Sequence, residues 1–166
     1  MKTADALNLL IALEERVARL YFGFFRAFRE DPVAAACWWE LARDEYGHAG
    51  VLKMVRELAA SDADCGEIGP RLWSLVDTVE RCEQQALTVD ALPNALELAI
   101  RLESSELDAL GDRFLQALAS DLPGGAARAF LPSDRHRRRL AQAADRTADP
   151  KLRKRLETLL GDLRGQ

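Results

Sequence analysis

The residues best suited to do chemistry in this chain are Glu45 and His48, which form an E-x-x-H motif inside a long apolar segment. Residues three apart lie on one face of a helix, so the carboxylate and the imidazole are expected to point the same way. A carboxylate is rarely buried unless it is paired or coordinates a metal. The motif alone is weak evidence, because many helices contain it by chance. Its weight depends on whether other helices bring similar residues to the same depth.

Three other amphipathic segments carry the same kinds of residue within their apolar stripes. Glu14 interrupts the first stripe, Glu103 and Glu106 occupy the centre of another, and His136 faces inward on the last. Carboxylates held close together cannot all stay ionised without a cation, because like charges raise each other's pKa. A carboxylate-rich site with imidazole suits iron or manganese better than metals that prefer thiolates. The pattern therefore predicts a site for one or two divalent metals.

Each of these residues also has a simpler interpretation when it is taken alone. A single glutamate in a helical stripe usually lies at its edge, with the carboxylate in water. A single histidine on an apolar face is more often a hydrogen-bonded core residue than a ligand. The coincidence across four helices favours the metal site over these alternatives.

The elements that must position these residues are all predicted to be helices. Asp31 followed by Pro32 is a typical N-cap and first helical residue, and Pro132 is expected to kink or restart a later helix. A helix of about 28 residues spans roughly 40 Å, so mid-helix residues of antiparallel neighbours meet near the centre of a bundle. The expected helices cover residues 3 or 5 to about 29, 32 to 60, 70 to 87 (a crossover), 90 to 120, 126 to 146, and 149 to 163.

Composition agrees with a single all-α domain over residues 1–166, comprising a bundle at about 3–146 and a short basic C-terminal helix. The chain is rich in Ala, Leu, Arg and Glu and poor in β-branched residues. No long uninterrupted apolar run or secretory leader is visible, so a soluble, cytoplasmic protein without membrane contact is expected. The 3 cysteines form no C-x-x-C, which argues against a disulfide framework or a thiolate zinc site.

Over about residues 3–146 the sequence resembles the rubrerythrin-like branch of the ferritin-like superfamily. The resemblance consists of Glu14 with Tyr21 seven residues later, the E-x-x-H of helix two, an E-x-x-E at Glu103, and the segment 94–103 that leads to it. It implies a ferritin-like four-helix bundle with a crossover between the second and third bundle helices. Such bundles enclose two iron ions bridged by carboxylates, and members of the family reduce peroxides or oxidise ferrous iron.

The resemblance also implies roles for individual residues. Glu45 would bridge the metals, and Tyr21 would act in catalysis by donating a hydrogen bond or a proton. The chain would be a homodimer that binds two irons, with manganese or zinc as other options, and would act as a di-iron peroxidase or ferroxidase on peroxide, O2 or Fe(II). It lacks the family's four-cysteine rubredoxin-type module, so electrons would come from a separate donor protein. The implied metal ligands are Glu14, Glu45, His48, Glu103, Glu106 and His136.

One departure from the family leaves a second function open. The family's fourth helix carries a glutamate three residues before its last ligand, and this chain has Ser133 there. The alternative is a degenerate bundle that binds one metal or none and has a non-catalytic iron-binding or interaction role. A third option, nucleic-acid or anion binding by the arginines at 135 and 137–139, is disfavoured because few aromatic residues accompany them and the net charge is -4.

Overall fold

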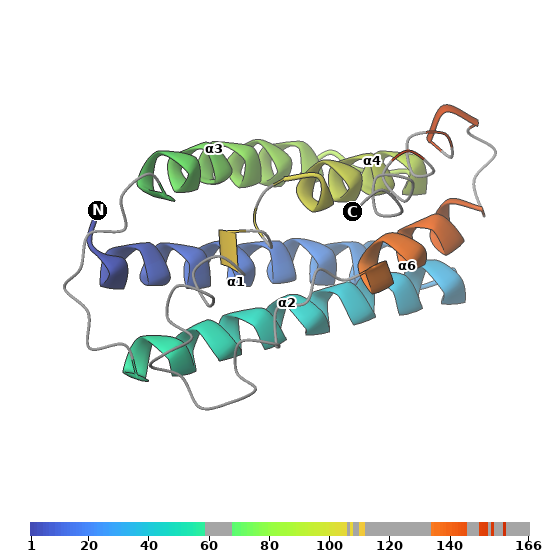
Figure 1. The fold of residues 1–166 in the computed structure, drawn as a ribbon. Coiled ribbons are helices and arrows are strands. Elements are labelled where there is room, and N and C mark those ends of the chain that lie inside the picture. Colours follow the sequence, from blue (N-terminus) through green and yellow to red (C-terminus); the bar gives the residue numbers. More distant parts are fainter. Residues whose placement is uncertain are drawn as a thin grey trace.

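The structure is a computed structural model, and it describes residues 1–58, 68–105, 107, 110–111, 134–145, 150–152, 154 and 158, with the backbone alone at 58 and 134–137. Its regular elements are α-helices, which confirms the all-α class (Figure 1). They are α1 (Thr3–Ala27), α2 (Pro32–Leu58), α3 (Ile68–Ala86), α4 (Leu92–Glu103) and α6 (Asp134–Ala144). No helix formed by the described residues has the length and apolarity needed to cross a membrane.

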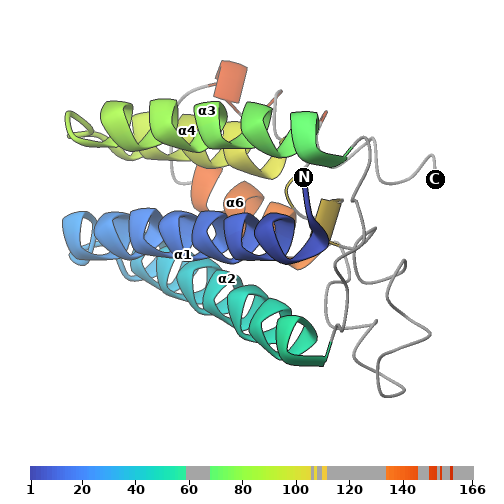
Figure 2. The ribbon, with the colours of Figure 1, turned by 90° about the vertical axis from the view of Figure 1, so that its left-hand side faces the viewer.

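The helices pack side by side around a common core. α1 and α2 form a long antiparallel pair, α3 lies along α1, and α4 turns back along α3 (Figure 1). α6 lies between α4 and α2, so the principal contacts run in a ring through all of these helices (Figure 2). α3, expected as a crossover, buries Leu72, Leu75, Val79 and Cys82 and is therefore a full wall of the core.

The start of α2 follows from local capping. The Oδ1 atom of Asp31 accepts hydrogen bonds from the backbone N–H groups of Val33, at 2.9 Å, and Ala34, at 3.2 Å. Pro32 occupies the first helical position, where its missing N–H has no cost. The predicted N-cap is confirmed, and it fixes the register in which α2 presents its ligand-type residues to α1.

The course of α4 differs from the prediction of one unbroken helix to about residue 120. α4 begins at Leu92, slightly later than the expected start at residue 90, and ends at Glu103. The hydroxyl of Ser104 donates to the carbonyl of Ile100 at 2.6 Å, and that of Ser105 donates to the carbonyl of Leu102 at 2.5 Å. Serines that bond to their own helix in this way compete with its backbone ladder, so the break follows Glu103.

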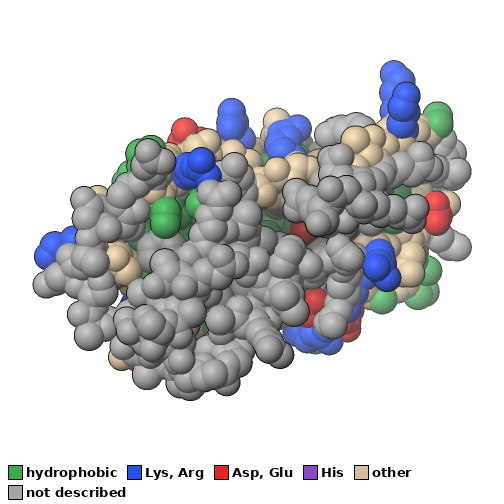
Figure 3. Space-filling model, in the orientation of Figure 1, with side chains coloured by type: hydrophobic (Ala, Val, Ile, Leu, Met, Phe, Trp, Pro, Cys, Tyr) green, Lys and Arg blue, Asp and Glu red, His purple; other side chains and the backbone are tan. Residues whose placement is uncertain are grey.

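Ion pairs connect the helices around the core. Arg139 on α6 donates to Asp44 at 2.8 Å and to Glu40 at 2.9 Å, both on α2. Arg16 on α1 donates twice to Glu83 on α3, at 3.0 and 2.6 Å. On the face shown in Figure 3, described Lys and Arg side chains occur separately along the margins rather than in one patch. Arg139 and Arg16 therefore join neighbouring helices.

Both α1 and α2 contain glycines that the packing of the described chain does not require. Gly23, Gly47 and Gly50 are exposed, and a Cβ atom built on any of them would meet nothing within 4 Å. Glycine in a helix interior is less favourable than alanine by roughly 0.5–1 kcal/mol, because it loses more backbone entropy on folding. These positions therefore weaken the two helices without easing any contact.

Candidate metal centre

The antiparallel pair of α1 and α2 brings three of the predicted ligands together. Glu14 comes from α1, and Glu45 and His48 come from α2 at the same depth. All three are buried, and one ligand atom from each lies within 4.8 Å of the others. The prediction that the helix-one glutamate and the E-x-x-H pair face a common point is thus supported by the geometry of three residues.

The distances within this cluster are close to those around a bound metal. The Nδ1 atom of His48 lies 3.2 Å from Oε2 of Glu45 and 3.7 Å from Oε2 of Glu14. Metal bonds of about 2.1 Å place neighbouring ligand atoms about 3 to 3.5 Å apart, depending on the coordination geometry. Small side-chain adjustments would therefore let all three residues bind one ion.

Glu14 carries buried carboxylate oxygens that the described residues leave unsatisfied. Its side chain is fully buried, and neither carboxylate oxygen has a hydrogen-bond partner among the described residues. Burying a polar group without a partner costs roughly 1–3 kcal/mol, and more for a charged group. Its ion-pair distance to His48 is beyond hydrogen-bond range. A cation bound between these residues would satisfy oxygens that have no hydrogen-bond partner in the described part of the chain.

The electrostatics of the cluster favour bound protons when no metal is present. Burial, reinforced by the charge of Glu14, raises the pKa of Glu45 to about 8. Burial acts to lower the pKa of His48, but Glu14 and Glu45 outweigh it and raise that pKa to about 11. The apo cluster therefore holds extra protons near neutral pH, and a divalent cation could replace them.

Tyr21 and Glu103 lie beside this cluster. Tyr21 is fully buried on α1, and its hydroxyl donates to Oε1 of Glu103, at the end of α4, at 3.0 Å. Both residues, with Glu45, line a cavity of about 10 Å³, which is roughly the space of one water molecule. A predicted catalytic residue and a predicted ligand are thus brought next to Glu45.

The remaining predicted residues fall where the structure gives no side chain. Glu106 and Ser133 lie outside the described residues. His136 belongs to α6 by its backbone, but its side chain lies outside what is described. The sequence pattern favoured pairing of the arginine-rich helix face with the acidic part of the chain or with a partner subunit, but it did not identify the residues involved. Arg139 holds α6 against Asp44, the neighbour of Glu45. The available signal was Glu40 and Asp44, two acidic residues one turn apart on α2.

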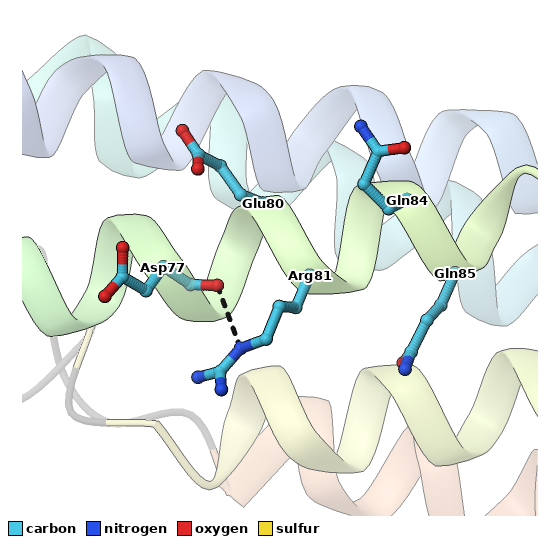
Figure 4. A pocket seen from close by; sticks show the side chains of 5 residues that line it. All are labelled: Asp77, Glu80, Arg81, Gln84 and Gln85. Carbon is cyan, nitrogen blue, oxygen red and sulfur yellow. Dashed lines mark hydrogen bonds between the residues drawn. The ribbon is translucent and has the colours of Figure 1, made fainter.

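A second hollow, on the surface of α3, has a different character. It is lined by Asp77, Glu80, Arg81, Gln84 and Gln85, and Figure 4 shows these side chains pointing in different directions. Arg81 donates to the backbone carbonyl of Asp77 at 3.1 Å. The lining of this hollow offers no convergent set of ligand atoms, so the cluster of Glu14, Glu45 and His48 is the better candidate site.

Comparison of the chain with known protein families, with curated proteins and with solved structures finds no match. The functional argument therefore starts from the Glu14–Glu45–His48 cluster. Its chemistry is that of a buried site with two carboxylates and one imidazole.

Proposed function

We propose that this protein binds a divalent transition metal through Glu14, Glu45 and His48. With iron bound there, it would act as a ferritin-like, rubrerythrin-like oxidoreductase. The substrate would be peroxide, O2 or Fe(II). The observation that carries the proposal is the buried carboxylate of Glu14, which lies beside an E-x-x-H pair and accepts no hydrogen bond from any residue that the structure describes. The competing explanation is a metal-free ionic cluster in which His48 alone balances the two glutamates.

The donor set supports a catalytic rather than a purely structural metal. Two carboxylates and one imidazole suit iron, manganese or zinc, and three protein ligands leave coordination positions for a substrate. Bound iron would supply the redox chemistry that peroxide reduction or Fe(II) oxidation needs. Glu14 and Glu45 would balance its charge, and His48 would bind as a neutral donor. Tyr21, whose hydroxyl donates to Glu103 beside Glu45, would serve as the proton donor.

A second candidate function is the binding of one metal without catalysis. Two observations favour it: Ser133 stands at the position of the family's bridging glutamate, and Glu103 is already engaged by the hydroxyl of Tyr21. A two-metal site would require Glu103, Glu106 and His136 as further ligands. The number of bound metals therefore separates the two candidates.

Metal addition is expected to stabilise the apo protein. A ligand that binds only the native state adds about 2.7 kcal/mol at a hundredfold excess over its dissociation constant. Thermal unfolding with Fe(II) under anaerobic conditions, and with Mn(II), would measure the gain, and metal analysis after desalting would give the stoichiometry. The Glu14→Gln variant should lose most of the gain, because removing even an outer partner of a ligand weakens metal affinity by about 10- to 100-fold.

Glu15→Gln is the matched control, since Glu15 is adjacent in sequence but pairs with Lys53 at the surface. This variant should respond to metal as the parent does. A melting temperature that does not change on adding metal would contradict the proposed metal site. So would a metal-induced rise that is equally large in the parent and in the Glu14→Gln variant. Two bound irons that turn over peroxide would support the oxidoreductase, and one inert metal would support the alternative.

A further inference from the structure

We propose that Tyr21, Trp38 and Trp39 form a path for single electrons between the candidate metal centre and the protein surface. The biological use of this path rests on the proposed redox function. The path itself depends on the positions of three side chains and needs no metal. Tyrosine and tryptophan are among the side chains most readily oxidised by one electron, and the path runs from two buried rings to an exposed one.

The inner end of the path is Tyr21. It lines the same small cavity as Glu45 and donates its phenolic proton to Glu103 at 3.0 Å. A phenol that loses an electron becomes strongly acidic, so its oxidation is easiest where an acceptor for its proton is already hydrogen-bonded. Glu103 is that acceptor. The pair can therefore be oxidised and reduced again with the proton moving between two fixed oxygens.

The middle of the path is Trp38, whose ring stacks on Tyr21. The ring centroids are 6.0 Å apart and the planes are 27° from parallel. Trp38 is fully buried, and its Nε1–H has no hydrogen-bond acceptor among the described residues. An oxidised indole normally loses this proton, but the described residues offer no acceptor for it. An oxidised indole that keeps the proton stays a cation, which takes an electron back readily and so relays it.

The outer end is Trp39, the next residue on α2. Consecutive residues on a helix point about 100° apart, so Trp39 leaves the core that Trp38 fills. It is 48% exposed and is supported by Phe25, with ring centroids 5.5 Å apart, and by Phe22, at 6.3 Å. Its indole can therefore meet an oxidant or a reductant from solution, and along the chain it directly follows Trp38.

The transfer balances when an outside one-electron oxidant starts it. The oxidant takes one electron from Trp39. Trp38 then reduces the oxidised Trp39, and Tyr21 reduces the oxidised Trp38. The phenolic proton of Tyr21 passes to Glu103. The net result is one electron gained by the oxidant and one neutral tyrosyl radical at Tyr21. Run in reverse, the same steps deliver an electron from a surface reductant to the interior.

The test uses the metal-free protein. It has so few tyrosines and tryptophans that those outside the path can be removed by substitution. The protein has 2 tyrosines and 3 tryptophans, so a Tyr46→Phe, Trp73→Phe background keeps the three path residues and no other Tyr or Trp. Photogenerated ruthenium(III) tris-bipyridine serves as the oxidant. Transient absorption and electron paramagnetic resonance should then detect a tyrosyl radical, and Tyr21→Phe should abolish it.

Removing either tryptophan from this background should abolish the tyrosyl signal. Trp39→Phe changes an exposed side chain and should leave the fold intact, and circular dichroism would check the buried Trp38→Phe variant. No tyrosyl radical in the background protein, or an undiminished one in Trp39→Phe, would overturn the path. Because no metal is present, such a failure would leave the metal proposal standing. Conversely, a protein that binds no metal could still show the path.

Discussion

Replacing His48 by alanine is expected to destabilise the metal-free protein by about 3 kcal/mol at pH 7 and to abolish its stabilisation by metal. The Nδ1 atom of His48 lies 3.7 Å from the buried Glu14 carboxylate and 3.2 Å from that of Glu45. Without His48, the described residues place no positive charge beside the buried Glu14 carboxylate. Removing one partner of a buried ion pair is costly because it leaves a buried charge uncompensated. Chemical denaturation and metal analysis would measure the two effects.

A double-mutant cycle separates this explanation from simple loss of packing. Glu14→Gln removes the uncompensated charge, so the Glu14→Gln, His48→Ala double variant should be more stable than His48→Ala alone. Residues that merely fill the core would instead give nearly additive losses. A small, additive effect of His48→Ala with metal binding retained would show that His48 is only a core residue.

The apo protein is expected to lose stability steadily from about pH 6 to pH 9. The pKa of Glu45 rises from 4.5 to about 8 on folding, and that of His48 rises from 6.5 to about 11. Both groups therefore hold protons in the folded state that the unfolded chain has released. Their stabilisation is complete below the unfolded pKa values and is lost as the pH rises toward the folded ones. Each extra proton costs about 1.4 kcal/mol of stability per pH unit in this range.

Saturating metal should remove or reverse this trend. Metal ligands bind in their deprotonated forms, so protons compete with the metal less as the pH rises. Urea unfolding at several pH values, with chelator and then with Mn(II), would give the two slopes. The Glu14→Gln variant should show a shallower apo slope, because the charge of Glu14 contributes to both pKa shifts. A metal-free stability that rises between pH 6 and 9 would contradict the charge arrangement described here.

The parts of the fold that the sequence predicted well are those set by local rules. The N-cap of Asp31 and the proline after it determine where α2 starts. The apolar stripe then determines which face turns inward, and the three-residue spacing of Glu45 and His48 puts both on that face. Glu14 could be placed with them because two long helices joined by a short turn pack antiparallel.

The features that were not predicted depend on side chains that compete with the backbone for hydrogen bonds, or on packing between segments far apart in the sequence. The end of α4 after Glu103 was not predicted, because the apolar periodicity continues past Ser104 and Ser105. Periodicity takes no account of serine hydroxyls that hydrogen-bond to carbonyls of their own helix. α3 was expected as a connection because it carries no buried carboxylate, yet its apolar stripe makes it part of the core. The contact of Tyr21 with Glu103 joins residues 82 positions apart, and only the fold brings them together.

The exposed glycines of α1 and α2 have a practical consequence for protein engineering. Alanine at Gly23 and Gly50 would lie on open helix surface, and each change can add up to about 1 kcal/mol of stability. Gly47 is better left alone, since it adjoins His48. A scaffold strengthened at these two positions would tolerate the loss of buried ligands, so the centre could be dismantled one residue at a time in a protein that stays folded.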